Sequence, residues 1–233
     1  MTGEGRRIAL VTGASRGIGR AVALQLAREG WRVVATARSQ KALEILDDEI
    51  KALGGEATLV PLDLRDFDGI DRLGGALFER FGKLDGLAAC AGALGSLTPA
   101  HQASPSLMEE VTAVNFTANW RLIRAMHPLL RTSDAGRAVF LTSSVARAPR
   151  AYWGPYAATK AALEALVMSY AAEIAITTIR VNLFNPGPTR TAMRAKAYPG
   201  EDPMTLATPE DVAPAIVAML AADYAANGDC LGA

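Results

Sequence analysis

Tyr156 and Lys160 stand four residues apart in the stretch YWGPYAATK, which is otherwise rich in small and apolar residues. On a helix, this spacing places both side chains on one face, a turn apart. One interpretation is a surface tyrosine whose ring rests on a lysine stem. The other is a proton donor whose acidity a fixed ammonium increases, because a nearby cation stabilises phenolate. The stretch alone leaves both interpretations open.

The chemistry of the second interpretation needs a partner elsewhere in the chain. A phenol has an ordinary pKa of ~10, so it exchanges protons poorly near neutrality without such a cation. Reduction of a carbonyl requires a proton on oxygen and a hydride on carbon, and a nicotinamide cofactor can supply that hydride. This chemistry therefore requires a dinucleotide site and elements that position it.

Short apolar runs alternate with longer helical patterns along the chain. The runs are apolar throughout, as in strands that are covered on both faces. They are 8–12 (IALVT), 31–37 (WRVVATA), 57–62 (ATLVPL), 85–90 (DGLAAC), 138–143 (AVFLTS) and 179–184 (IRVNLF). Ser39 and Thr208 are placed to cap helices, and Gly30 to end one. The pattern predicts a single α/β domain over residues 1–233, a Rossmann-type doubly wound parallel sheet flanked by helices.

A glycine-rich turn joins the first strand to the first helix. It reads Thr12-Gly13-Ala14-Ser15-Arg16-Gly17-Ile18-Gly19. Glycines at such a junction let the backbone turn tightly and approach a ligand, and the free N–H groups of the helix start favour phosphate. A tight turn without a ligand is the alternative. The position between a strand and an amphipathic helix favours dinucleotide binding.

The end of the second strand bears on the choice between NAD and NADP. NAD-binding folds usually place a carboxylate there for the ribose hydroxyls, but this strand ends Ala35-Thr36-Ala37-Arg38-Ser39, without an acid. Arg38 can meet a 2′-phosphate with its planar guanidinium, and Arg16 can approach from the glycine turn. Each arginine could also be a solvated surface charge. Together with the missing carboxylate, they favour NADP(H) over NAD.

Composition excludes several other classes. Of 233 residues, 50% are hydrophobic and 21% charged, so a substantial core can form. Lys plus Arg number 24 and Asp plus Glu 24, which argues against nucleic-acid binding. The first apolar run, IALV, is too short for a signal peptide or a membrane span. The two cysteines form no metal-ligand pattern. We expect a cytoplasmic protein with no metal and no membrane partner.

The motifs in order resemble the short-chain dehydrogenase/reductase family. Residues 12–19 match its TGxxxGxG signature, Tyr156 and Lys160 its YxxxK, and Asn185-Pro186-Gly187 its turn after strand six. The segments WGPYAATK and NPGPTRTAMRA, with a downstream EDP, further resemble a bacterial branch of the family, the YciK-type oxidoreductases.

This resemblance implies four catalytic residues, Asn115, Ser143, Tyr156 and Lys160. Lys160 would also hold the nicotinamide-ribose hydroxyls, Ser143 would polarise the substrate oxygen, and Asn115 would fix a water that links Lys160 to solvent. Ser144 is a rival for Ser143, but the separations from Asn115 and Tyr156 favour Ser143. The resemblance also implies further cofactor contacts, from Asp63, Leu64, Ala91, Gly92, Pro186, Gly187, Thr189 and Thr191.

Two departures from the family stand out. Its Asn-Asn-Ala-Gly reads Ala89-Cys90-Ala91-Gly92 here, so an amide that stabilises the strand is lost. The C-terminal segment NGDCLGA stops short of the family's usual end, which predicts a stunted last strand.

Residues 188–207 contain prolines and glycines but no long periodic helix, which indicates a flap over the substrate. Arginines 147, 150 and 194 lie near the same rim, where solvated surface charge is the plainer interpretation.

The favoured function is an NADP(H)-dependent oxidoreductase, a carbonyl reductase or alcohol dehydrogenase, acting on a small molecule. One alternative is a non-catalytic NADP(H)-binding regulator or scaffold, which would have no need for the proton-transfer residues. Another is a nucleotide-sugar epimerase or dehydratase, but its usual TGxxGxxG and larger C-terminal domain are missing here. The resemblance also implies a homodimer or homotetramer, packed through largely apolar helices at 104–130 and 152–177.

Overall fold

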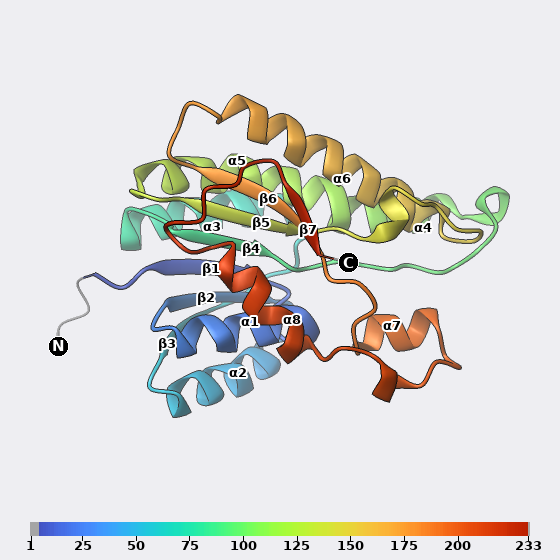
Figure 1. Ribbon diagram of the computed structural model, residues 1–233, viewed down its shortest axis with the longest axis horizontal. Helices are drawn as coiled ribbons and strands as arrows, with labels where there is room; N and C mark the ends of the chain where they lie inside the picture. Colours follow the sequence, from blue (N-terminus) through green and yellow to red (C-terminus); the bar gives the residue numbers. More distant parts are fainter. Residues whose placement is uncertain (1–4, 233) are drawn as a thin grey trace.

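The structure, a computed structural model, describes residues 5–232 and has one parallel sheet between two helix layers (Figure 1). Within these residues the sheet has seven strands in the order β3-β2-β1-β4-β5-β6-β7. They are β1 (Ile8–Thr12), β2 (Arg32–Ala37), β3 (Glu56–Pro61), β4 (Gly86–Ala89), β5 (Arg137–Leu141), β6 (Arg180–Asn185) and β7 (Cys230–Gly232). The strand order reverses between β1 and β4, and such a reversal opens a crevice at the carboxyl ends of the strands. The predicted doubly wound α/β fold is confirmed.

Helices cover both faces of the sheet. One face carries α1 (Gly17–Arg28), α2 (Gln40–Ala52) and α8 (Pro209–Ala218), and the other α3 (Phe67–Phe81), α5 (Ala118–Thr132) and α6 (Gly154–Glu173) (Figure 1). Each layer buries its own apolar cluster against the sheet. Because both faces are covered, the central strands are apolar throughout, as expected from their sequences.

Helix ends follow local sequence signals. The Ser39 hydroxyl accepts from the amide of Ala42 at the start of α2. Thr208 and Asp211 form a reciprocal capping box at the start of α8. Gly30 has φ 81°, a left-handed conformation that glycine adopts without strain just after α1. All three predicted helix boundaries are confirmed.

The two sheet edges differ from the central strands. Strand β3 is only partly buried along its length, because it has a neighbour on one side alone. Strand β7 spans three residues, Cys230–Gly232, and pairs with β6 over Leu183–Asn185. Within residues 5–232, β7 is thus the shortest strand of the sheet.

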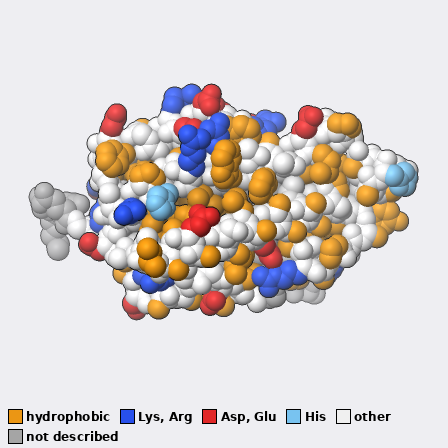
Figure 2. Space-filling model, turned by 90° about the horizontal axis from the view of Figure 1, so that it is seen from above, with side chains coloured by type: hydrophobic (Ala, Val, Ile, Leu, Met, Phe, Trp, Pro, Cys, Tyr) orange, Lys and Arg blue, Asp and Glu red, His pale blue; other side chains and the backbone are white. Residues whose placement is uncertain are grey.

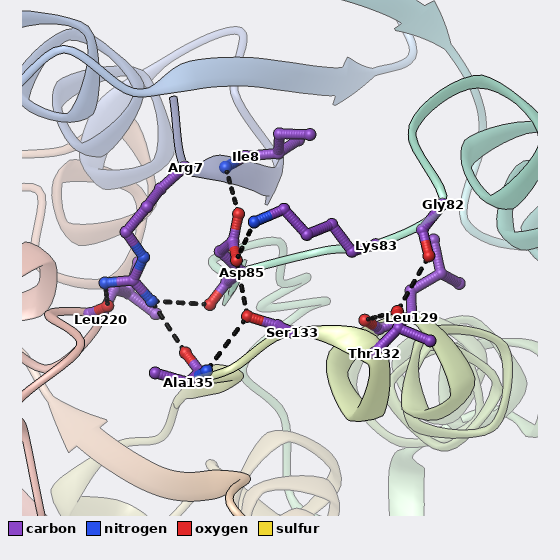
Figure 3. A network of polar contacts seen from close by, with 10 residues as sticks. All are labelled: Arg7, Ile8, Gly82, Lys83, Asp85, Leu129, Thr132, Ser133, Ala135 and Leu220. Carbon is purple, nitrogen blue, oxygen red and sulfur yellow. Dashed lines mark hydrogen bonds and ion pairs between the residues drawn. The ribbon is translucent and has the colours of Figure 1, made fainter. Parts of the chain in front are cut away.

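A buried polar network ties together the end of the sheet opposite the crevice (Figure 3). The side chain of Asp85 is almost fully buried, and its carboxylate accepts from the amide of Ile8 (2.9 Å), the hydroxyl of Ser133 and the ammonium of Lys83 (3.1 Å). Arg7 donates to three backbone carbonyls of the same network. Every oxygen of this buried carboxylate thus has a partner, as burial of a charge requires. This end of the sheet is therefore fixed, and the site lies at the other end.

Two connections shape that other end. The predicted helix at 104–130 consists of α4 (Pro105–Thr112), a π-helical turn η2 (Ala113–Thr117) and α5. Residues 188–207 hold only the short helix α7 (Ala192–Ala197) and the turn η4 (Pro203–Thr205), in agreement with the lack of a long helical pattern. The short turn η1 (Ala100–Gln102) lies in the loop before α4, and the short turn η3 (Ser144–Ala146) lies in the loop before α6. Over residues 5–232, no helix is long and apolar enough to cross a membrane.

Candidate active site

A cleft of ≈ 820 Å³ lies at the carboxyl ends of β1, β4 and β5. Most of the predicted cofactor residues line it: Gly13, Ser15, Arg16, Gly17, Ile18, Gly19, Arg38, Asp63, Leu64, Ala91, Gly92, Tyr156, Pro186 and Thr191. Residues from six separate segments thus meet in one crevice at the reversal of strand order. The cleft is large enough for a sizeable cofactor, since small-molecule sites span roughly 300–1,000 Å³.

The glycine-rich turn forms the floor of the cleft. A Cβ atom on Gly19 would lie 2.5 Å from the carbonyl oxygen of Gly13, and one on Gly13 would lie 2.9 Å from Cα of Ala91. Gly13 and Gly17 also have positive φ values of 68° and 56°. Helix α1 begins at Gly17, and the side chain of the preceding Arg16 caps none of its amides. Its first N–H groups and the space left by the glycines fit a dinucleotide pyrophosphate.

The charged side chains at the outer part of the cleft divide into two sets. Arg16 and Arg38 are exposed, line the cleft, and form no ion pair within residues 5–232. Asp63 is held by Arg65, whose Nη2 lies 2.6 Å from its carboxylate. This hydrogen bond lowers the pKa of Asp63, and the charge of Arg38 acts in the same direction with a smaller effect. Arg65 also lines the cleft and was missed in the sequence. Two arginines thus remain available for an anion where β2 ends.

Tyr156 and Lys160 project from the same side of α6. Lys160 Nζ lies 5.8 Å from the centroid of the Tyr156 ring and donates to the carbonyl of Leu141 at 2.7 Å. The lysine is 3% exposed, while Tyr156 lines the cleft. Ser143, which follows β5, lies near enough to the Tyr156 side chain to act on the pKa of the phenol. The structure thus brings three of the four predicted catalytic residues close together, and Tyr156 is the one among them that lines the cleft.

Burial controls the protonation of this pair. It raises the pKa of Tyr156 to about 12, with the nearby Ser143 hydroxyl acting in the opposite direction. It also lowers the pKa of Lys160 to about 8, with Cys90 and Glu164 acting in the opposite direction. The prediction that Lys160 lowers the phenol pKa below its ordinary value is wrong here, because removal from water dominates. At pH 7 the phenol keeps its proton and the lysine its charge.

Asn115, the fourth predicted residue, lies in the π-helical turn and is fully buried. Its Oδ1 accepts from the amide of Ala93 (2.8 Å), and its Nδ2 donates to the carbonyl of Ala93 (2.8 Å) and to the hydroxyl of Thr159 (3.1 Å). The side chain therefore joins the loop after β4 to α6. Its contact on α6 is Thr159, which lies between Tyr156 and Lys160 in sequence. Single π-helical turns of this kind are frequent at functional sites.

Glu164 and Thr142 support the same wall and were missed in the sequence. The Thr142 hydroxyl donates to Glu164 at 2.7 Å, and Thr142 directly precedes Ser143. Glu164 follows Lys160 by one helical turn, and its charge raises the pKa of Lys160 against burial. An acid four residues after a buried lysine was the signal that could have identified it.

Three predicted cofactor residues lie outside the cleft lining. Lys160 is buried, with its ammonium beside the Tyr156 ring. Thr189 is buried, and its hydroxyl donates to the carbonyl of Pro186 at 3.1 Å. Gly187 has φ 65°, and its amide donates to the side chain of Asn185. Gly187 and Thr189 thus shape the turn that presents Pro186 and Thr191 to the cleft.

The altered segment Ala89-Cys90-Ala91-Gly92 retains its link to the central strand. The amide of Ala91 donates to the hydroxyl of Thr12 at 3.1 Å, which joins the end of β4 to the end of β1. Cys90 lines the cleft, and burial raises its pKa to about 12, so the thiol stays protonated. The hydroxyl of Thr12 thus connects this segment to the end of β1.

Comparison with known proteins agrees with this arrangement. The family model described as short chain dehydrogenase matches residues 7–202. The oxidoreductase YciK of Escherichia coli K12 is 42% identical over 211 residues, 89% of this chain and 83% of that protein. A short chain dehydrogenase of Salmonella enterica serovar Typhi has a TM-score of 0.94 at 38% identity, covering 97% of this chain and 95% of the other.

A further solved structure, a short chain dehydrogenase of Escherichia coli CFT073 complexed with NADPH, has a TM-score of 0.91 at 39% identity. It covers 96% of this chain and 95% of the other. The fold and the cleft define an oxidoreductase built on a dinucleotide-binding sheet. The chain belongs to the short-chain dehydrogenase/reductase family, and YciK-type proteins are among its relatives, as the motifs predicted.

Proposed function

We propose that this protein is an NADP(H)-dependent oxidoreductase that interconverts a carbonyl and an alcohol, with Tyr156 as the acid or base. The observation that carries the proposal is the position of Tyr156. Its side chain lines the same cleft as the glycine-rich turn, with Ser143 near the phenol and the Lys160 ammonium beside its ring.

The residues of the site divide the work of a carbonyl reduction. Bound NADPH would supply the hydride to the carbonyl carbon and become NADP⁺. Tyr156, protonated at neutral pH, would give its proton to the carbonyl oxygen, and Ser143 would hold that oxygen by a hydrogen bond. The charge of Lys160 would stabilise the phenolate that Tyr156 becomes. Asn115, from the family resemblance, would fix a water that returns a proton through Lys160.

Loss of the Tyr156 hydroxyl tests the proton-transfer role. In Tyr156→Phe we expect kcat to fall at least about a hundredfold, the scale of general acid catalysis. The dissociation constant for NADPH should stay within about twofold, because the ring remains. NADPH absorbance, followed with a panel of ketones and aldehydes, gives the first value, and fluorescence titration the second. Tyr152→Phe, which removes a hydroxyl from a largely exposed side chain nearby, should match the unmodified enzyme.

Two results would contradict the proposal. Near-normal turnover by Tyr156→Phe would remove Tyr156 from the chemistry. NADPH binding without oxidation of NADPH by any carbonyl of the panel would instead favour a regulator or scaffold that keeps the fold.

Selection of NADP(H) over NAD(H) is proposed for Arg38 and Arg16. Both are exposed at the cleft without an ion-pair partner in the described chain, and the relative from Escherichia coli CFT073 was solved with NADPH. Arg38→Asp should weaken NADPH binding at least about tenfold, by removing a charge-assisted contact to the 2′-phosphate, and leave NADH binding less affected. Fluorescence titration with both cofactors measures this. Arg131→Asp, the same charge change at an exposed site outside the cleft lining, is the control. Tighter binding of NADH than NADPH by the unmodified protein would overturn the assignment.

A further inference from the structure

Two consecutive residues at the end of β5 are fastened to α6. The carbonyl of Leu141 accepts from Nζ of Lys160 at 2.7 Å, and the hydroxyl of Thr142 donates to Glu164 at 2.7 Å. Because Lys160 and Glu164 are one helical turn apart, both contacts link the strand to the same side of α6. Ser143 directly follows the two anchored residues, so its position relative to α6 depends on them.

The carboxylate of Glu164 holds the chain on both sides of Ser143. One oxygen accepts from the hydroxyl of Thr142, and the other accepts from Nε of Arg147 at 2.8 Å. Arg147 directly follows the turn η3, in which the amide of Ala146 donates to the carbonyl of Ser143 at 3.0 Å. A single side chain of α6 thus ties the residue before Ser143 and the turn after it to the helix that carries the reactive phenol.

The ammonium of Lys160 is buried and needs a compensating negative charge, since the lysine is 3% exposed. The ionisable side chains that act on it or lie beside it within residues 5–232 are Cys90, Tyr156 and Glu164. Burial raises the pKa of both Cys90 and Tyr156 to about 12, so neither is charged at neutral pH. Glu164 therefore provides the negative charge, and it acts to raise the pKa of Lys160.

The ionisable groups around Glu164 leave this charge in place. The side chain of Glu164 is 12% exposed, whereas that of Arg147 is 61% exposed, so water screens the charge of the arginine more strongly. Burial raises the pKa of Cys230 in β7, so this thiol stays protonated. Arg147 therefore offsets the charge of Glu164 only in part.

We propose that Glu164 is a positioning residue of the active site. It holds Ser143 in place through Thr142 and Arg147, and it is the fixed counter-charge of the buried lysine. Glu164 lies outside the cleft lining and acts through these neighbours, without touching substrate or cofactor. The proposal rests on the function proposed above, in which Ser143 holds the substrate oxygen and Lys160 stabilises the phenolate.

Glu164→Gln tests the role of the charge, because glutamine keeps the size and a hydrogen-bond acceptor. A lysine without its counter-charge loses its proton at lower pH, so the fall of kcat/KM at high pH should begin at least about half a pH unit lower. Initial rates between pH 6 and 10, with NADPH and one ketone of the panel, measure the shift. Glu173→Gln, the same change at an exposed acid of α6, should leave the profile unmoved.

Thr142→Val tests the hold on Ser143, because it removes the hydroxyl and leaves the charge of Glu164. At pH 6, where the lysine is charged, kcat should fall about tenfold, since small displacements of a catalytic group slow the reaction strongly. The pH at which kcat/KM falls should not move. Thr142→Ser keeps the hydroxyl and should retain most of the rate.

Binding of NADPH at pH 6, measured by fluorescence titration, separates positioning from folding. Its dissociation constant should stay within about twofold in all these variants, because the glycine-rich turn is untouched. An unmoved pH profile in Glu164→Gln would overturn the role of the charge. Loss of NADPH binding by that variant would overturn the proposal as a whole, because Glu164 would then serve the fold alone.

The remaining outcomes concern Ser143 and the reaction itself. A normal kcat in Thr142→Val would overturn the hold on Ser143. In each of these cases the unmodified enzyme still reduces the ketone, so the proposed oxidoreductase function stands. If the unmodified protein binds NADPH and oxidises it with no ketone of the panel, the proposed function is wrong, and the role of Glu164 with it.

Discussion

Burial and neighbouring side chains shift the pKa values of Tyr156 and Lys160 in opposite directions, and burial has the larger effect on both residues. Tyr156 has its pKa raised to about 12 and Lys160 its pKa lowered to about 8, each mainly by removal from water. The phenol therefore enters a reduction as an acid that holds its proton over a wide pH range. The lysine charge, in contrast, is present below its pKa and lost above it.

This difference predicts the pH dependence of reduction. We expect kcat/KM to be constant below about pH 8 and to fall up to about tenfold per pH unit above it, as Lys160 loses its proton. Tyr156 does not lose its proton until near pH 12, so the fall belongs to the lysine. Initial rates at saturating NADPH between pH 6 and 10, with one substrate of the panel, measure the profile.

Lys160→Arg is the control for this assignment. A guanidinium keeps its charge to pH values above 12, so whatever activity this variant retains should stay constant through pH 10. A profile of the unmodified enzyme that is flat through pH 10 would contradict the link between the lysine charge and turnover.

At the scale of elements, the contact between β1 and α1 depends on glycines that no other residue can replace. Gly19 lies against the backbone of Gly13, and its missing side chain lets the helix begin close behind the strand. The same close approach leaves the first amides of α1 at the cleft floor. One structural requirement thus serves both packing and cofactor binding.

Two glycine substitutions should therefore have opposite effects. Gly19→Ala places a methyl 2.5 Å from a backbone oxygen, so we expect a loss of about 1–3 kcal/mol in the free energy of unfolding and weaker NADPH binding. Gly75→Ala, inside α3 with open space around it, should add about 0.5–1 kcal/mol, because alanine favours the helix. Urea denaturation and fluorescence titration measure both. Equal stability of the two variants would contradict the packing argument.

At the scale of the whole molecule, no segment within residues 5–232 covers the outer face of α6. Its exposed side chains include Ala158, Ala165, Met168 and Ala172. Figure 2 looks onto the helix layer that contains α5 and α6, where hydrophobic and uncharged side chains lie between scattered charged ones. Small side chains allow a second helix to approach closely. We propose that two copies of the chain pack through this face, as the family resemblance implies.

A charged substitution tests this packing. Ala165→Arg should weaken self-association at least about tenfold, because an unpaired charge would be buried between the copies. Sedimentation velocity over a range of protein concentrations measures it. Ala52→Arg, at an exposed alanine ending α2 in the other helix layer, should leave association unchanged. A monomeric unmodified protein at micromolar concentration would contradict the prediction.

The sequence was sufficient for the order of elements and for the location of the cleft. Apolar runs such as 8–12 and 179–184 mark buried strands, and signals such as Thr208 and Gly30 mark helix ends, because these effects depend on residues close together in the chain. The spacing of Gly13, Gly17 and Gly19 likewise located the turn. These features are local, so a linear sequence contains them.

Only the tertiary structure decided the environments of the reactive groups. The hydrogen bond from Thr142 to Glu164 joins segments that are distant in sequence. The pairing of Arg65 with Asp63 is local, but the cleft that both residues line is assembled from distant segments. The raised pKa of Tyr156 has the same origin. Burial and charge at a side chain are summed over neighbours from the whole fold, and spacing along one helix does not reveal that sum.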